Sequence, residues 1–201
     1  MKFIIATKNK KKLNELQRIL LPLGCDAVSE KESGFTFPEV EEDGTTFAEN
    51  AKIKAVSAMK TTGMPAIADD SGLCVDALDG APGIYSARFS GDHDDSANNQ
   101  KIFDELHAVP DEKRTARFVC NICCVFPNGD EITAQGVCEG KIGYELVGEN
   151  GFGYDPLFMV GDKSFAELTD AEKDQISHRG NAMREFKQKL EMYLKGNGYD
   201  K

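Results

Sequence analysis

Segments typical of strands and of helices alternate along the chain, and this order restricts the fold to one class. Residues 3–6 form an apolar run typical of a strand, and the leucines that follow recur at the spacing of an amphipathic helix. Thr46 with Glu49 has the capping-box pattern that begins a helix, and Asn128-Gly129 between two apolar runs predicts a hairpin. The sequence therefore predicts an α/β fold with a mixed sheet.

Cap and turn signals divide the chain into predicted elements. Strands are expected at residues 2–6, 27–29, 65–68, 73–77, 116–126, 131–138 and 156–160. Helices are expected at residues 9–23, 46–60, 96–107, 169 onward and 181–195. Asp69-Asp70-Ser71-Gly72 is expected to end one strand before the next begins. No repeat or linker marks a boundary, so we expect a single domain over residues 1–201, or two lobes that share a sheet.

The composition predicts a cytoplasmic globular protein. The chain has 201 residues, of which 29% are charged, and a net charge of −10. No apolar run approaches the roughly 20 residues that span a bilayer, and the early lysines leave no room for a signal peptide's apolar region. The acidic balance argues against nucleic acid as a partner, because a duplex-binding surface needs a basic face. It leaves room for a small phosphorylated ligand in one local basic pocket.

The cysteines predict buried thiols. Cys120, Cys123 and Cys124 lie in a strand-like run, where small apolar side chains are typical. Cys120 and Cys123 have CxxC spacing, but no second pair follows at the spacing of a zinc site. We therefore expect reduced core thiols and no use of this pair for metal or redox chemistry.

A cluster of lysines lies at the start of the first predicted helix, where the backbone dipole is already positive. The cluster comprises Lys8, Lys10, Lys11 and Lys12. A strand that runs into a helix N-terminus is a ready anion site, although the glycines of a Walker loop are missing. The alternative is a solvated lysine face. Because positive charge is unfavourable at this place, the cluster favours binding of phosphate groups.

Acidic residues gather at three places. Asp69 and Asp70 suit Mg²⁺, or one of them could activate water as a base; the alternative is a plain turn. Glu41-Glu42-Asp43 could supply a further metal carboxylate, or it is a solvated loop. Asp92-His93-Asp94-Asp95 lies among small polar residues and predicts an exposed loop leading to a helix; the alternative is a metal site.

Two further motifs suit recognition of a planar base. In Gly151-Phe152-Gly153-Tyr154-Asp155-Pro156 an aromatic ring could stack on a heterocycle while Asp155 or the backbone reads its edge. The alternative is a tight turn with core aromatics. In Ser177-His178-Arg179-Gly180, between two helices, the His-Arg pair could bind a phosphate or a base carbonyl, or the motif is an interhelical cap. Together with the lysines and carboxylates, these motifs predict a nucleoside triphosphate hydrolase.

Several stretches, in the right order, closely resemble the noncanonical purine nucleoside triphosphate pyrophosphatases, the inosine/xanthosine triphosphatase family. They are FAENAKIKA at 47–55, AIADDSGL at 66–73, GAPGIYSAR at 80–88, GFGYDPLF at 151–158 and ISHRG at 176–180. The resemblance spans nearly the whole chain. One departure is Lys8, which stands where the family usually has glycine.

The resemblance implies a homodimeric, Mg²⁺-dependent house-cleaning enzyme with an elongated mixed sheet flanked by helices and an active-site groove between two lobes. It would hydrolyse ITP, dITP and XTP to the monophosphate and pyrophosphate. Asp70 would accept a proton from the attacking water and would bind the metal with Glu41, for which the neighbouring Glu42 is an alternative. The implied substrate contacts are Thr7, Lys8, Asn9, Lys10, Lys11, Lys12, Lys54 and Ser71, with Phe152, Gly153, Tyr154, Asp155, Lys173, His178 and Arg179 around the base.

Three alternatives stay open. A pyrophosphatase of the same mechanism could act on modified pyrimidine triphosphates. A nucleotide-binding module would retain affinity without turnover, and a scaffold with acidic loops would bind no nucleotide.

If the substrates are purine nucleotides, donors such as Arg179 would favour the 6-oxo group of hypoxanthine and xanthine over the amino group of adenine.

Overall fold

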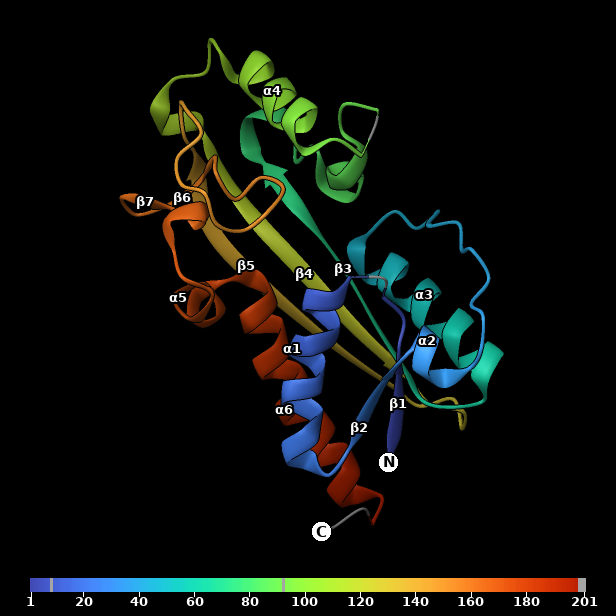
Figure 1. The fold of residues 1–201 in the computed structure, drawn as a ribbon. Helices are drawn as coiled ribbons and strands as arrows, with labels where there is room; N and C mark the ends of the chain where they lie inside the picture. Colours follow the sequence, from blue (N-terminus) through green and yellow to red (C-terminus); the bar gives the residue numbers. More distant parts are fainter. Residues whose placement is uncertain (8, 92, 199–201) are drawn as a thin grey trace. The chain divides into compact units, whose positions relative to one another are not determined.

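The sheet is mixed, as the sequence predicts. A computed structural model describes residues 1–7, 9–91 and 93–198, and in these residues seven strands form one sheet in the order β2-β1-β3-β4-β5-β6-β7 (Figure 1). β1 pairs in parallel with β2 and β3, whereas β6 is antiparallel to β5 and β7. The strands are β1 (Lys2–Ile5), β2 (Asp26–Ser29), β3 (Ala66–Val75), β4 (Thr115–Val125), β5 (Glu131–Ile142), β6 (Phe158–Val160) and β7 (Lys163–Ser164). The predicted α/β class is confirmed.

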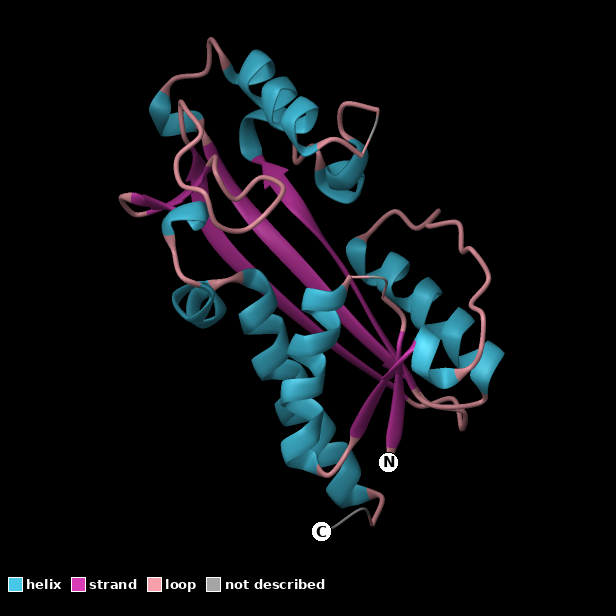
Figure 2. Ribbon diagram, viewed as in Figure 1, coloured by secondary structure: helices cyan, strands magenta, loops and turns pink. Residues whose placement is uncertain are grey.

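Figure 2 shows the helices in cyan, and two of them begin directly after the caps that the sequence predicts. Thr46 and Thr169 each accept a hydrogen bond from the backbone N–H of the glutamate three positions on, which bonds back to the cap residue. A third such box, at Ser29, opens a one-turn helix that was not expected. The helices are α1 (Lys10–Leu20), α2 (Glu30–Ser33), α3 (Phe47–Thr62), α4 (Asp95–Leu106), α5 (Asp170–Ile176) and α6 (His178–Gly196).

One prediction is wrong: β3 runs unbroken from Ala66 to Val75, without the expected turn at Asp69-Asp70-Ser71-Gly72. Aspartate, serine and glycine favour turns locally, but here they continue a strand that lies between β1 and β4 in the sheet and pairs with β1 at Ala66 and Ile67. The two carboxylates stay in the strand because Lys12 and Lys54 pair with them.

The chain forms two compact units. The first unit comprises residues 1–70 and 121–135 and the chain from Ala182 onward. In it, the connection from β1 to β2 runs in one direction along the sheet and the return to β3 in the other. Right-handed crossovers then place α1 and α3 on opposite faces (Figure 1). α3 presents Ala51, Ala55 and Ala58 to the sheet, and these small side chains allow close packing.

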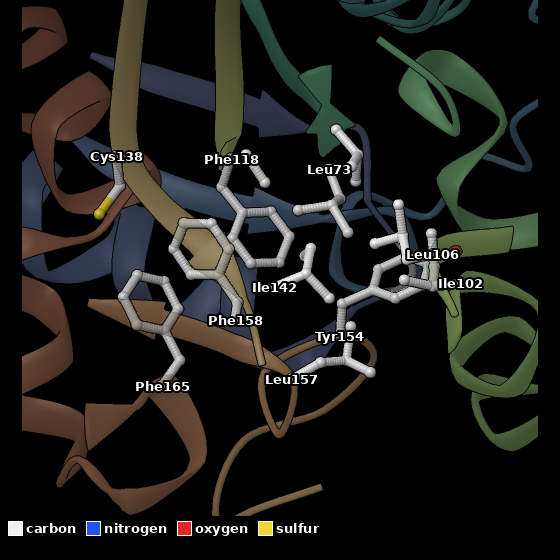
Figure 3. Packing of buried hydrophobic residues seen from close by; sticks show 12 residues of the cluster. Leu73, Ile102, Leu106, Phe118, Cys138, Ile142, Tyr154, Leu157, Phe158 and Phe165 are labelled. Atoms are coloured by element: carbon white, nitrogen blue, oxygen red, sulfur yellow. The ribbon is translucent and has the colours of Figure 1, made fainter. Parts of the chain in front are cut away.

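The second unit comprises residues 71–120 and 136–181, and its core combines aliphatic side chains with a group of aromatic rings (Figure 3). The ring of Phe118 lies 4.7 Å from that of Phe158 and stacks on Phe165 at 5.8 Å, between ring centroids. α4 contributes Ile102 and Leu106 to the same cluster.

The strand cysteines are buried core thiols, as predicted. Cys120, Cys123 and Cys124 lie buried in β4 and form no disulfide. Burial, with the neighbouring Glu131 carboxylate, raises the pKa of the Cys123 thiol to about 12. The thiol is therefore protonated at neutral pH and unreactive. Across the described part of the chain, no helix has the length and apolar character needed to cross a membrane.

Candidate active site

The turn between β1 and α1 presents a helix N-terminus with no acidic residue in its first turn. Thr7 Oγ1 accepts a hydrogen bond from the Asn9 N–H at 3.1 Å, and Asn9 Oδ1 accepts one from the Lys12 N–H at 3.4 Å. Thr7 and Asn9 therefore shape and cap the start of the helix. Lys8 lies outside the described residues, as do the side chains of Lys10 and Lys11.

Lys12 reaches from α1 to β3. Its ammonium lies 2.6 Å from Asp69 Oδ2, and the Asp69 side chain is only 2% exposed. A buried carboxylate is costly unless a cation pairs with it, so this contact ties the start of α1 to the middle of β3.

Next to this pair, Lys54 of α3 lies between two carboxylates. Its Nζ donates to Asp70 Oδ1 at 3.1 Å and to Glu42 Oε2 at 2.8 Å. Burial alone would lower the pKa of Lys54, but the Asp70 and Glu42 carboxylates raise it above its ordinary value. Burial raises the pKa of Asp70, and the nearby Lys54 partly offsets this. Asp70 thus has the raised basicity that suits a proton acceptor.

The donor set fits a divalent cation in part. Asp70 Oδ2 is buried, and no described residue donates a hydrogen bond to it. Glu42 is half-buried and shares Lys54 with Asp70, whereas Glu41 is exposed. Two carboxylates and substrate phosphates suffice for Mg²⁺. In the described residues, no cluster of three or more potential ligands is assembled.

A separate cavity of about 730 Å³ lies between α3 and the loop that precedes it. Its walls include Val40, Asp43 and Glu49 but neither Lys54 nor Asp70. The cavity is therefore distinct from the lysine–carboxylate cluster.

In the second unit, Asp155 organises the glycine-rich loop. Its Oδ2 accepts from the Phe152 N–H at 2.8 Å and from Lys173 Nζ at 2.6 Å. A Cβ at Gly151, where φ is +79°, would overlap Asp155 Oδ2, so only glycine fits there. The sequence singled out Asp155 and Lys173 as separate base contacts, and the structure brings them together as an ion pair.

The two aromatic residues of this loop have different environments. Tyr154 is buried and its hydroxyl donates to the Ser86 carbonyl at 2.7 Å, whereas the Phe152 side chain is 46% exposed. Lys173 Nζ lies 5.1 Å from the centroid of the Phe152 ring. Phe152 therefore presents the ring that a planar ligand could reach, and Tyr154 anchors the loop.

His178 and Arg179 lie in the first turn of α6, which begins at His178 rather than at the expected residue 181. The His178 ring stacks on Phe118, with centroids 4.7 Å apart. Arg179 Nη2 donates to Ser71 Oγ at 3.4 Å. Ser177 Oγ accepts from the Gly180 N–H, so a cap is present beside the two candidate binding residues.

Sequence reasoning missed two residues that contact the loop. Asp95 accepts from the Gly153 N–H, and Asn99 donates to the Gly153 carbonyl. Their four-residue spacing on a predicted helix was visible, but nothing local pointed to a loop more than fifty positions away.

An α/β fold, lysines paired with buried carboxylates, and a rigid loop with an exposed aromatic ring define a protein with the groups of a nucleotide-hydrolase site. The Ham1 family model matches residues 3–189, and the chain belongs to that family. This confirms the predicted family, since its curated relatives include dITP/XTP pyrophosphatases.

Individual relatives are similar over nearly the whole chain. This chain is 56% identical over 188 residues to the dITP/XTP pyrophosphatase of Desulforamulus reducens, and the match covers 92% of each chain. The solved structure of the Staphylococcus aureus Ham1 protein has a TM-score of 0.86 and 40% identity, covering 98% of this chain and 100% of that one. The dITP/XTP pyrophosphatase of Mycobacterium abscessus has a TM-score of 0.79 and 45% identity, covering 92% and 96%.

Proposed function

We propose that this chain hydrolyses ITP, dITP and XTP to the nucleoside monophosphate and pyrophosphate, and so removes deaminated purines from the nucleotide pool. The observation that carries this proposal is the half-buried Asp70 carboxylate, which keeps one oxygen without a described donor beside Lys54. The names of the curated relatives support the substrate class.

Asp70 accepts the proton of the attacking water. Burial raises its pKa, which makes it a better base than an ordinary aspartate, and the nearby Lys54 ammonium partly offsets that rise. Thr7, Lys8, Asn9, Lys10, Lys11 and Lys12 hold the triphosphate at the start of α1, where free N–H groups and the helix dipole favour negative charge. Lys54 faces the phosphates from α3.

A divalent cation joins this site, held by Asp70 and one glutamate of the loop before α3. When bound, Mg²⁺ offsets the charge that develops on the phosphate oxygens. Glu41 is the ligand that the family resemblance implies. Glu42 is the second candidate, because it already shares Lys54 with Asp70.

The second unit binds the base. Phe152 stacks on the purine, while Gly153, Tyr154, Asp155 and Lys173 keep the loop that carries it in place. His178 and Arg179 supply donors for the 6-oxo group, and Ser71, which accepts a hydrogen bond from Arg179, contacts the substrate beside them. Adenine has an amino group there, which would leave buried donors unpaired and so lower binding.

Pyrophosphate release from a panel of triphosphates tests the proposal. We expect the highest kcat/KM for ITP, dITP and XTP and much lower values for ATP, dUTP and methylated pyrimidine triphosphates. Equal or higher rates with the pyrimidines would replace the proposed substrate class with that alternative. ITP with Mg²⁺ should also raise the melting temperature, which a scaffold that binds no nucleotide would not show.

The assembly and setting of the enzyme complete the proposal. We propose a homodimer of single-domain, two-lobed chains that acts in the cytoplasm without a nucleic-acid or membrane partner. Gel filtration with light scattering tests the dimer directly.

A further inference from the structure

Two residues of α4 hold a single glycine of the base-binding loop by both of its backbone polar groups. Asp95 Oδ2 accepts from the Gly153 N–H at 2.9 Å, and Asn99 Nδ2 donates to the Gly153 carbonyl at 3.1 Å. Because Asp95 and Asn99 are four positions apart, they lie on one face of the helix. We propose that this pair acts as a set of positioning residues that fix Phe152 for base recognition, an inference that rests on the proposed function.

The geometry explains why both contacts matter. Gly153 has φ of +61°, a left-handed conformation, and no heavy atom lies within 4 Å of where its Cβ would be. The glycine is therefore required by the backbone turn and not by crowding. Holding both the N–H and the carbonyl of one residue prevents rotation on either side of it.

The residues around Gly153 are held as well. The Tyr154 ring packs beside Ile102 and Leu106 of α4 (Figure 3). Its hydroxyl donates to the Ser86 carbonyl. On the other side, the Phe152 N–H donates to Asp155. The loop is thus held by hydrogen bonds at Phe152, Gly153 and Tyr154, and the exposed Phe152 ring projects from it. A ring on a rigid loop loses less conformational freedom when a base stacks on it, so the rigidity contributes to affinity.

Asn99 is a polar residue at a buried helix position where packing alone would favour an apolar side chain. It is 5% exposed, and its Oδ1 is buried with no donor among the described residues. Ile102 and Leu106, three and seven positions on, are fully buried in the apolar cluster on the same helix face. A buried acceptor without a partner lowers stability, so the residue is explained by what its amide N–H does for Gly153.

The helix itself is anchored at both ends, which makes it a firm support. Asn98 Oδ1 accepts from the Ser90 N–H at 2.7 Å and its Nδ2 donates to the Ala87 carbonyl. At the other end, the buried Arg114 donates to the Leu106 carbonyl at 2.7 Å. Because both ends of α4 are held by other segments, Asp95 and Asn99 hold Gly153 in a fixed position.

Four variants separate a positioning role from a general structural one. Asn99→Asp keeps the shape of the side chain but removes the donor, and Asp95→Ala removes the acceptor. Asp95→Asn retains an acceptor oxygen, and Gln100→Ala changes an exposed neighbour on the same helix. Steady-state kinetics with ITP and ATP are measured for each variant.

We expect Asn99→Asp and Asp95→Ala to raise the KM for ITP about tenfold with kcat within about twofold, which indicates lost binding of the base. The ratio of kcat/KM for ITP over ATP should fall. Asp95→Asn should restore most of the wild-type KM, and Gln100→Ala should match the wild type. An equal loss of kcat with both nucleotides at unchanged KM would overturn the proposal.

Amide hydrogen exchange at Gly153 tests its hydrogen bonds to α4 in the absence of substrate. We expect slow exchange in the wild type and at least roughly tenfold faster exchange in Asp95→Ala, where the acceptor is gone. Because Asp95 is exposed, this variant keeps its fold even if Asn99→Asp does not. Fast exchange in the wild type would overturn the positioning role, whereas a wild type that releases no pyrophosphate from ITP would overturn only the proposed function.

Discussion

The lysine–carboxylate cluster of the first unit and the charged outer face of β4 and β5 in the second unit use the same chemistry in different surroundings. Lys12 and Asp69 are 17% and 2% exposed in their side chains. Arg117 and Glu139, by contrast, are 34% and 67% exposed, and Arg117 also pairs with Asp76. Buried pairs cost desolvation, whereas exposed pairs contribute little to stability. Because its burial costs desolvation that stability alone does not explain, the buried cluster is the one that the proposed function uses.

The largest expected effect is a difference in kcat between variants of two aspartates, Asp70 in the lysine–carboxylate cluster and Asp76 in the exposed ion pair. Asp70→Asn should keep the fold and lower kcat for ITP by roughly 10²–10⁴, the usual contribution of a positioned base. Asp76→Asn, which removes an exposed ion-pair carboxylate, should leave kcat near the wild-type value. Pyrophosphate release with Mg²⁺ measures both variants, and near-normal turnover of Asp70→Asn would remove Asp70 from the base role.

A second test compares stability at two lysines of the second unit whose side chains are 18% and 44% exposed, Lys173 and Lys141. Lys173→Met leaves Asp155, whose side chain is 4% exposed, without its cation and should lower the free energy of unfolding by about 3 kcal/mol. Lys141→Met removes the exposed partner of Asp111 and should change it by less than about 0.5 kcal/mol. Urea unfolding followed by circular dichroism measures both, and equal losses would contradict the distinction by burial.

A third test asks which glutamate of the loop before α3 binds the divalent cation together with Asp70. Glu42→Gln should raise the Mg²⁺ concentration for half-maximal activity by at least about tenfold, because it removes a carboxylate next to Asp70. Glu41→Gln, at an exposed position, serves as the matched variant. The larger effect at Glu41 would assign that residue as the ligand, as the family resemblance implies.

The smallest expected effect is a pH dependence of the exposed network. Hydrogen bonds from Arg117, and then from Thr115, lower the pKa of Asp76 below its ordinary 3.8. Its contribution to stability is therefore present above about pH 3.8 and is lost as the pH falls through the lower pKa of the folded state. The difference in urea midpoint between the wild type and Asp76→Asn should shrink over that range. A difference that stays constant down to pH 2 would contradict the role of Asp76 ionisation.

Much of the fold could be predicted because its signals are local. The capping boxes at Thr46 and Thr169 and the Asn128-Gly129 turn each act within a few residues, and the structure has helices and a hairpin there. The candidate site was partly accessible for the same reason, since lysines at a helix start and an aromatic–glycine loop are sequence-local patterns.

Other features depend on residues far apart in the sequence. The turn propensity of Asp69-Asp70 did not determine the local structure. Both residues lie in β3, where lysines from two helices pair with their carboxylates. The pairing of Asp155 with Lys173 and the grip of Asp95 and Asn99 on Gly153 likewise join distant segments. The amino-acid sequence by itself determined where elements begin and which chemical groups are available. Only the tertiary structure decided which charges meet and which are buried, because desolvation and ion pairing depend on neighbours that folding alone brings together.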